Sequence, residues 1–261
     1  MTKLHRAGVR TKCGNAETAT HEAHGKLFII IAAVLIIATI VNTSAAQAAR
    51  GGFSEVQIPA EVIFKQSADA VFMLETFDAE GESIRTGSGF FISADGFAIT
   101  NLHVIQNAAS ANITLYNGDV YPVKGVNASS EEYNLAIISI DSDEDGWDYL
   151  TFADSDLIVT GNSVYVIGSP LGFINTMSAG IISNTKRDIE GEILIQFTSP
   201  ISFGSGGSPL LNARGQVLGV TSSSFSYGQN LNLAVPINFA KSLKPGECVT
   251  LKSLLKDDEQ N

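Results

Sequence analysis

The chain has 261 residues, 44% of them apolar and 16% charged, and its 27 acidic and 16 basic side chains give a formal net charge of −11. These values exclude a disordered polar chain, and the acidic balance disfavours nucleic acid as a partner, because affinity for phosphates comes mostly from Lys and Arg. Two cysteines, Cys13 and Cys248, are too few for a disulfide framework or a four-ligand zinc site, and no cofactor is expected.

The N-terminal residues have the pattern of an export signal. Five basic side chains precede the apolar run from Leu27 to Val41, and the small residues from Ser44 to Ala48 offer cleavage sites of the A-x-A type. A bilayer span needs about 20 apolar residues, so we expect residues 1–48 to be a signal peptide that is cleaved near Ala48. The alternative is an uncleaved membrane anchor. Both interpretations place the rest of the chain outside the cytoplasm, with His103 as its one histidine.

Short β-rich runs, bounded by turn residues, recur along the rest of the chain. The predicted strands cover Ala70 to Phe77, Gly89 to Ile92, Phe97 to Asn101, Asn112 to Tyr116, Asn134 to Ile140, Val164 to Ile167, Glu192 to Phe197, Val217 to Thr221 and Leu231 to Val235. Turns such as Ala94-Asp95-Gly96 separate them and suit hairpins. Helical turns are expected after His103 and over Phe239 to Leu243. The pattern predicts an all-β fold, built as two small barrels or one sandwich.

An acidic run from Asp141 to Asp148 lies midway along the chain. Asp141, Asp143 and Asp145 match positions 1, 3 and 5 of a calcium-binding loop, but Phe152 stands where the loop requires a bidentate glutamate. We interpret the run as a solvated linker between two halves of the domain. The three aspartates remain a weak calcium candidate, and no other metal site is expected.

Three segments carry motifs that occur together in one protein family. They are Thr86 to Ile92 (TGSGFFI), Ile99 to Val104 (ITNLHV) and Gly204 to Asn212 (GSGGSPLLN), with further matches in order at Tyr133 to Ile138, Gly168 to Gly172, Ser178 to Ser183 and Leu233 to Pro236. Together they resemble the trypsin-like serine proteases of the HtrA/DegP type. The resemblance implies a two-barrel, chymotrypsin-like fold, with a first barrel over residues 60–150 and a second over 155–243. Residues 244–261 are expected to form an acidic tail, too short for the PDZ domains usual in that family.

The resemblance assigns catalytic roles that this chain fulfils only in part. It makes His103 the general base, but Asn134 stands at the position of the aspartate and Gly206 at that of the nucleophilic serine. Without an Oγ at residue 206 no acyl-enzyme can form, unless Ser205 or Ser208 beside it serves as an alternative nucleophile. The backbone N–H groups of Gly204 and Gly206 are the expected oxyanion-binding pair.

We therefore expect an exported trypsin-like protease homologue that is catalytically impaired and binds peptides or proteins as a pseudoprotease. Two alternatives stay open. One is an active serine endopeptidase that uses Ser205 or Ser208, and the other is a calcium-linked or structural surface protein based on the acidic run. The expected partner is a polypeptide. If the leader is not cleaved, the run from Leu27 to Val41 would anchor the protein in the membrane. The sequence does not define an oligomeric state.

Overall fold

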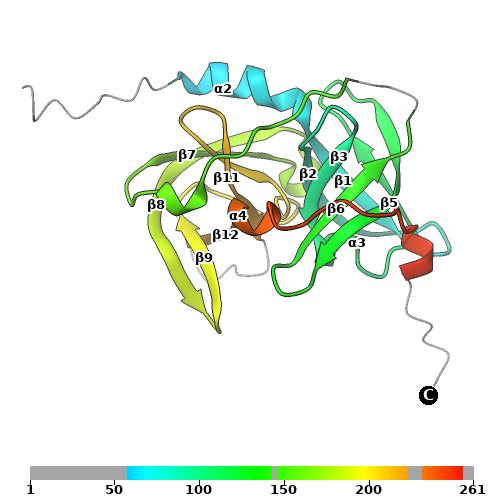
Figure 1. The fold of residues 1–261 in the computed structure, drawn as a ribbon. Helices are drawn as coiled ribbons and strands as arrows, with labels where there is room; N and C mark the ends of the chain where they lie inside the picture. Colours follow the sequence, from blue (N-terminus) through cyan, green and yellow to red (C-terminus); the bar gives the residue numbers. More distant parts are fainter. Residues whose placement is uncertain (1–57, 143–145, 223–230, 255–261) are drawn as a thin grey trace, which may run out of the picture. The chain divides into compact units, whose positions relative to one another are not determined.

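The described part of the chain, residues 58–142, 146–222 and 231–254 of a computed structural model, folds into two closed antiparallel barrels (Figure 1). The strands of the first barrel are β1 (Val71–Phe77), β2 (Ser83–Phe91), β3 (Phe97–Asn101), β4 (Ser110–Thr114), β5 (Val120–Ser130) and β6 (Leu135–Ile140). They pair in the order β1-β2-β3-β6-β5-β4, and the pairing of β4 with β1 closes the barrel.

Alternating side chains fill the interior of this first barrel. Phe72 and Leu74 on β1 are fully buried together with Phe91, Ile113 and Ile138 from the other strands. Successive residues of a strand point to opposite faces, so the inward positions are apolar and the sheet curls around them. The core of this barrel is therefore built from the inward-facing residues of the β-rich runs.

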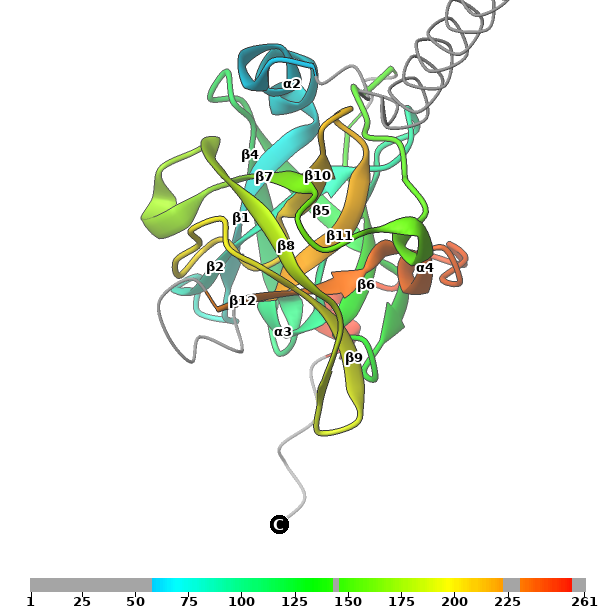
Figure 2. The same ribbon diagram turned by 90° about the vertical axis from the view of Figure 1, so that its left-hand side faces the viewer.

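The second barrel repeats the six-stranded arrangement. Its strands are β7 (Ser163–Gly168), β8 (Thr176–Ile189), β9 (Glu192–Phe197), β10 (Pro209–Asn212), β11 (Val217–Ser222) and β12 (Asn232–Pro236), paired in the order β10-β11-β12-β9-β8-β7. In Figure 2 the β8–β9 hairpin extends beyond the barrel. The closed pairing of both sheets confirms the all-β, two-barrel prediction and excludes the sandwich.

Helical segments are short and lie at the ends of the strands. They are α2 (Ala60–Ser67), η1 (Ala68–Ala70), α3 (Leu102–Ile105), η2 (Ser155–Leu157), η3 (Pro170–Gly172), α4 (Ile237–Ala240) and η4 (Leu251–Leu254). Helices α3 and α4 are the two helical turns expected from the sequence. Helix α2 was not expected; it starts after Pro59 and buries Ile63. None of the helices among the described residues is long and apolar enough to cross a membrane.

The two barrels share one apolar cluster. Ile99 and Ile137 of the first barrel belong to the same buried group as Leu211 and Val220 of the second. Burying apolar side chains on both sides of one interface fixes the barrels against each other, because each would otherwise expose that surface to water. A site that takes residues from both barrels can therefore have a defined geometry.

The residues after α4 return to the first barrel. Val249 and Val126 exchange two backbone hydrogen bonds, of 2.8 and 2.9 Å, and Leu251 is buried against the first barrel's core. Residues 244–254 of the expected tail are thus part of the folded domain. The leader with Leu27 to Val41, the cleavage site near Ala48 and the end of the acidic tail lie outside the described residues.

Candidate active site

His103 and Asn134 meet at one end of two paired strands. His103 is the second residue of α3, which follows β3 directly, and Asn134 immediately precedes β6, the strand that pairs with β3. Asn134 has a φ of 49°, in the left-handed region that asparagine adopts more readily than most residues. This conformation turns the chain into β6 and brings the amide of Asn134 next to the imidazole.

Both atoms of the Asn134 amide contact His103. Oδ1 accepts a hydrogen bond from the backbone N–H of His103 at 2.9 Å, and Nδ2 lies 2.8 Å from the ring Nδ1, closer than Oδ1 at 3.2 Å. With the oxygen accepting the backbone N–H, Nδ2 is the amide atom nearer to Nδ1 and can donate to it when the neutral ring carries its proton on Nε2. In that tautomer the ring presents a donor at the atom that, in a general base, must accept the proton of the nucleophile.

The surroundings of the ring favour its neutral form. Burial lowers the pKa of His103 below its ordinary value, and the positive charge of Arg85 acts in the same direction. The side-chain hydrogen bond with Asn134 acts in the opposite direction and raises this pKa, but burial has the larger effect. The net shift favours the uncharged imidazole.

We expect an NMR titration to give a pKa for His103 below 6.5, and ¹⁵N shifts at neutral pH to report the Nε2–H tautomer. Because the unfolded chain then binds this proton more readily than the folded chain, the contribution of His103 to the free energy of unfolding is present above about pH 6.5 and is lost as the pH falls. Asn134→Asp should raise the pKa, since a carboxylate stabilises the imidazolium. Asn107→Asp, which adds the same charge at another left-handed asparagine, is the control. A native pKa above 6.5 would contradict the assignment.

The loop from Gly204 to Ser208 is held from the first barrel by a single serine of β2. The Oγ of Ser88 donates to the carbonyl of Gly204 at 2.7 Å, and its backbone N–H donates to the carbonyl of Gly206 at 2.8 Å. The same Oγ accepts the N–H of Ser169 at 2.9 Å, from the β7–β8 connection. Ser88 is fully buried, so these bonds are shielded from competing water. It is the functional residue that the motif analysis missed.

Two peptide groups of this loop, Phe203–Gly204 and Ser205–Gly206, have carbonyls that accept hydrogen bonds from the second half of the domain. The carbonyl of Phe203 accepts from the N–H of Leu171 at 2.8 Å, and that of Ser205 accepts from the Oγ1 of Thr221 at 2.5 Å. The described residues contain no cis peptide bond, so the N–H of each following residue, Gly204 and Gly206, points to the opposite side. Neither N–H has an acceptor within the described part of the chain. Two unengaged donors so placed can bind one oxyanion.

The two candidate replacement nucleophiles face the protein interior. Ser205 is 2% exposed, and its Oγ accepts the backbone N–H of Ser202 at 3.3 Å. Ser208 is fully buried, and its Oγ fills the space that a side chain at Gly168 would need. The structure thus brings together His103 and Asn134 on one side and Gly204 and Gly206 on the other. The hydroxyls of Ser205 and Ser208 are packed within the loops of the second barrel.

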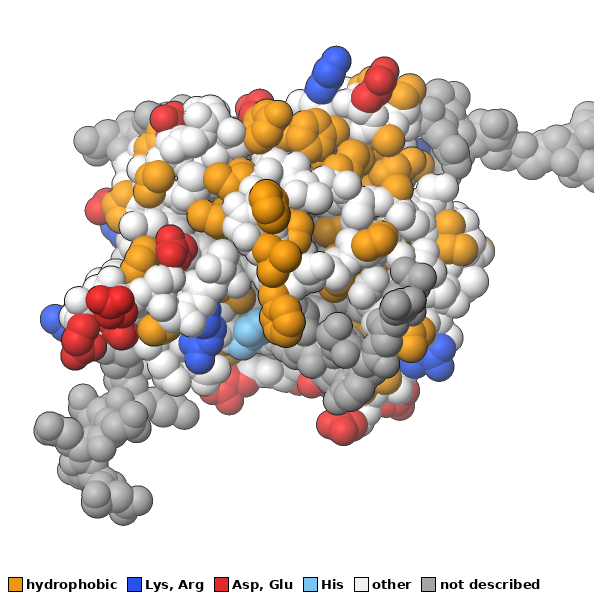
Figure 3. All heavy atoms as spheres, turned by 180° about the vertical axis from the view of Figure 1, so that it is seen from behind, with side chains coloured by type: hydrophobic (Ala, Val, Ile, Leu, Met, Phe, Trp, Pro, Cys, Tyr) orange, Lys and Arg blue, Asp and Glu red, His pale blue; other side chains and the backbone are white. Residues whose placement is uncertain are grey.

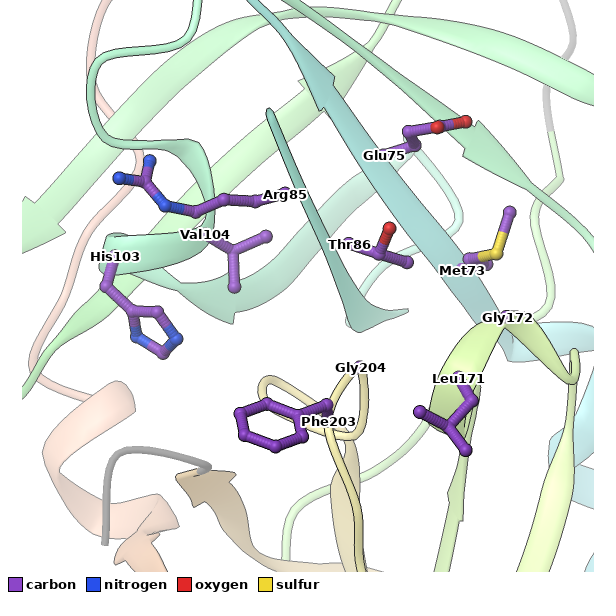
Figure 4. Close-up of a pocket in the computed structure, with 10 residues that line it drawn as sticks. All are labelled: Met73, Glu75, Arg85, Thr86, His103, Val104, Leu171, Gly172, Phe203 and Gly204. Atoms are coloured by element: carbon purple, nitrogen blue, oxygen red, sulfur yellow. The ribbon is translucent and has the colours of Figure 1, made fainter. Parts of the chain in front are cut away.

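A cleft of 740 Å³ opens between His103 and the loop (Figure 4). Its lining consists of Met73, Glu75, Arg85, Thr86, His103, Val104, Leu171, Gly172, Phe203 and Gly204. Leu171 and Phe203 are 70% and 81% exposed, and Figure 3 shows apolar side chains gathered beside the histidine on this face. Such a cleft, with an apolar rim and polar backbone groups, suits an extended polypeptide.

The calcium candidate stays a prediction. Asp143 and Asp145 lie outside the described residues, and only Asp141 is described, at the end of β6. Within residues 58–142, 146–222 and 231–254, no three His, Cys, Asp or Glu side chains are grouped to hold a metal ion.

Two barrels with a histidine, a loop whose Gly204 and Gly206 N–H groups have no acceptor among the described residues, and a cleft lined by His103 and Gly204 define the class of a trypsin-like peptidase domain. The family model of that description matches residues 87–220, just over half of the chain. The chain belongs to this family. Its relatives further identify it as a homologue of the HtrA/DegP type.

These relatives include proteins from several bacteria. A "Probable periplasmic serine endoprotease DegP-like" from Chlamydia trachomatis is 35% identical over 162 residues, which cover 59% of this chain and 32% of the relative. A protein of the same name from Rhizobium meliloti is 33% identical over 177 residues, which cover 66% of this chain and 33% of that relative. The solved structure of an HtrA-type protease, an AlgW variant with a tripeptide, matches with a TM-score of 0.65 and 30% identity over 70% of this chain and 62% of that one. The chain spans about a third of the length of these curated relatives.

Proposed function

We propose that the chain is an exported, catalytically impaired homologue of the HtrA/DegP-type proteases that binds polypeptides in its cleft. The observation that carries the proposal is the glycine at position 206, beside a histidine that lacks its aspartate. The activity of the relatives named above is proteolysis, and the tripeptide belongs to the AlgW structure. For this chain we propose that a polypeptide is the ligand.

Two independent changes oppose catalysis. Gly206 carries no Oγ, so the attack that forms an acyl-enzyme has no nucleophile. The Nδ2 of Asn134 lies 2.8 Å from Nδ1 of His103, and an amide that donates there favours the tautomer with the ring proton on the wrong nitrogen. In the Ser-His-Asp triad, replacing the aspartate by asparagine lowers turnover by about 10⁴ even when the serine is present. Because both the nucleophile and the aspartate are replaced, we expect the chain to bind a polypeptide without cleaving it.

The alternative of an active endopeptidase needs Ser205 or Ser208 as nucleophile. Both side chains are buried, and the Oγ of Ser205 accepts a backbone N–H. Reaching the imidazole would require breaking the loop's bonds to Ser88, and a misplacement of about 1 Å already costs about 10² in rate. This geometry favours the impaired enzyme.

Export is supported by two observations of different kinds. The first is the leader pattern, with its basic residues, the apolar run from Leu27 to Val41 and the A-x-A sites after it. The second is that the relatives from Chlamydia trachomatis and Rhizobium meliloti are named as periplasmic proteases. N-terminal sequencing of the exported protein distinguishes cleavage near Ala48 from the uncleaved membrane anchor.

We expect no covalent labelling when the protein is treated with a fluorophosphonate probe, because that reagent requires an activated serine. Labelled unfolded casein should bind, as measured by fluorescence anisotropy, and should remain intact on a gel. Ser205→Ala and Ser208→Ala serve to locate any label. Stoichiometric labelling that one of these substitutions abolishes would establish the active-endopeptidase alternative instead.

A further inference from the structure

A second cavity lies beside the first barrel, and it shares no lining residue with the cleft that holds His103. Its volume is 470 Å³, and its walls come from η1, from the turn that joins β4 to β5 and from residues 146–148. Its lining consists of Asp69, Leu115, Tyr116, Asn117, Asp119, Tyr121, Gly146, Trp147 and Asp148. Small-molecule sites in proteins have volumes of about 300–1,000 Å³, so this cavity is large enough to hold a small ligand.

The aromatic rings of this cavity are held in place by other rings. Trp147 stacks on the buried Phe91 with 4.7 Å between the ring centroids, and Tyr121 meets Trp147 edge-on at 5.1 Å. Tyr116 meets Phe64 of α2 edge-on at 5.8 Å. Because these side chains are already ordered, a ligand that contacts them incurs little further loss of conformational entropy.

The charged side chains of this lining are all carboxylates. They belong to Asp69, Asp119 and Asp148, which are exposed, and no Lys or Arg lies among the described residues of the lining. The carboxylate of Asp119 accepts a hydrogen bond from Nδ2 of Asn117 at 2.6 Å, which fixes its position in the turn. Aromatic rings attract cations through their quadrupole, and nearby carboxylates add Coulomb attraction. The lining therefore favours a positively charged ligand.

The distribution of the carboxylates distinguishes between kinds of cation. A calcium ion needs several oxygen ligands that converge at about 2.3–2.6 Å, and in the described part of the chain no three acidic, His or Cys side chains are grouped in that way. A single lysine or arginine side chain would bring one charge to three carboxylates. A linear amine with several ammonium groups can reach carboxylates on different sides of the cavity, while its methylene groups contact the rings.

We propose that this cavity binds a linear organic polyamine. Its ammonium groups lie beside Asp69, Asp119 and Asp148, and its methylene chain packs against Tyr116 and Trp147. The site is separate from the cleft, so this proposal and the proposed function can be tested independently.

The single tryptophan of the chain, Trp147, lines the cavity, so tryptophan fluorescence reports on this site alone. Spermidine is titrated into the protein at constant ionic strength, and we expect a saturable change in emission, with binding also detected by isothermal titration calorimetry. An uncharged diol of the same length should not bind. Calcium chloride or trilysine that binds more tightly than spermidine would show a metal site or a site for a basic polypeptide, and would overturn the proposal.

Asp69→Asn combined with Asp148→Asn should weaken spermidine binding about tenfold, because two of the three attractive charges are lost. The matched control is Glu80→Gln, which removes one negative charge from the β1–β2 turn. That turn lies at the other end of β4 from the cavity, since Phe77 pairs with Ser110. Glu80→Gln should therefore keep the native affinity.

Two substitutions of Tyr116 test the contribution of the rings. Tyr116→Leu should weaken spermidine binding, whereas Tyr116→Phe, which keeps the ring, should bind like the native chain. Thermal melting without ligand checks that each variant is folded. Absence of spermidine binding to the native chain by calorimetry, or equal weakening by Glu80→Gln and by the double aspartate variant, would overturn the proposal.

Discussion

Gly206→Ser combined with Asn134→Asp is expected to produce a measurable endopeptidase. The double variant restores an Oγ beside the imidazole and a carboxylate that orients the Nδ1–H tautomer, the two elements that the triad requires. The rest of the site is in place, because the N–H groups of Gly204 and Gly206 face outward and Ser88 holds their loop. Gly206 is not among the glycines with positive φ, so a serine there meets no backbone strain.

The single variants separate the two contributions. Gly206→Ser alone has a nucleophile but the wrong tautomer, and should cleave labelled casein about 10⁴-fold more slowly than the double variant. Asn134→Asp alone has no nucleophile and should remain at background. Gly206→Ser with Asn107→Asp carries the same net charge as the double variant without touching the ring, and should match Gly206→Ser alone. A double variant that folds and is still inactive would show that the cleft does not bind a scissile peptide productively.

The fold could be predicted from the sequence because its signals are local. Short β-rich runs bounded by turn residues indicate the strands, and the ordered motifs from Thr86 to Pro236 resemble one family closely enough to imply two barrels. Helix α2 and the return of Val249 to Val126 were missed for a different reason. Both depend on partners far away in the chain, which no local period reveals.

The site was predictable as a set of positions, but its hydrogen-bond directions were not. The motifs predict the positions of His103, which lines the cleft together with Gly204, and of Asn134, which contacts its ring. The direction of the Asn134 amide depends on the backbone N–H of His103, and the outward N–H groups depend on where the carbonyls of Phe203 and Ser205 find donors. These directions decide whether the groups around the cleft accept or donate hydrogen bonds. They follow only from the folded geometry.

The loop's geometry makes a second prediction of large effect, at Gly207. This residue has a φ of 88°, and a Cβ there would collide with the carbonyl oxygen of Ser88 and would lie 3.2 Å from the backbone nitrogen of Asn101. Gly118 has a φ of 93° with nothing near its Cβ position, so Gly118→Ala incurs the backbone strain alone. We expect Gly118→Ala to lower the free energy of unfolding by about 1 kcal/mol and Gly207→Ala by about 3 kcal/mol or more. Urea denaturation of both variants measures the difference.

The larger loss at Gly207 follows from what surrounds it. The Ser88 carbonyl also accepts the Oγ1 of Thr100 at 2.8 Å, and both groups belong to paired strands of the first barrel, so neither can move aside without breaking the sheet. The strain must then displace the loop, and with it the N–H of Gly206. In the absence of denaturant, where the variant is still folded, Gly207→Ala should therefore weaken the binding of labelled casein, whereas Gly118→Ala should not. Equal losses of stability in the two variants would mean that the loop yields easily, and that its donors are not held in place by the first barrel.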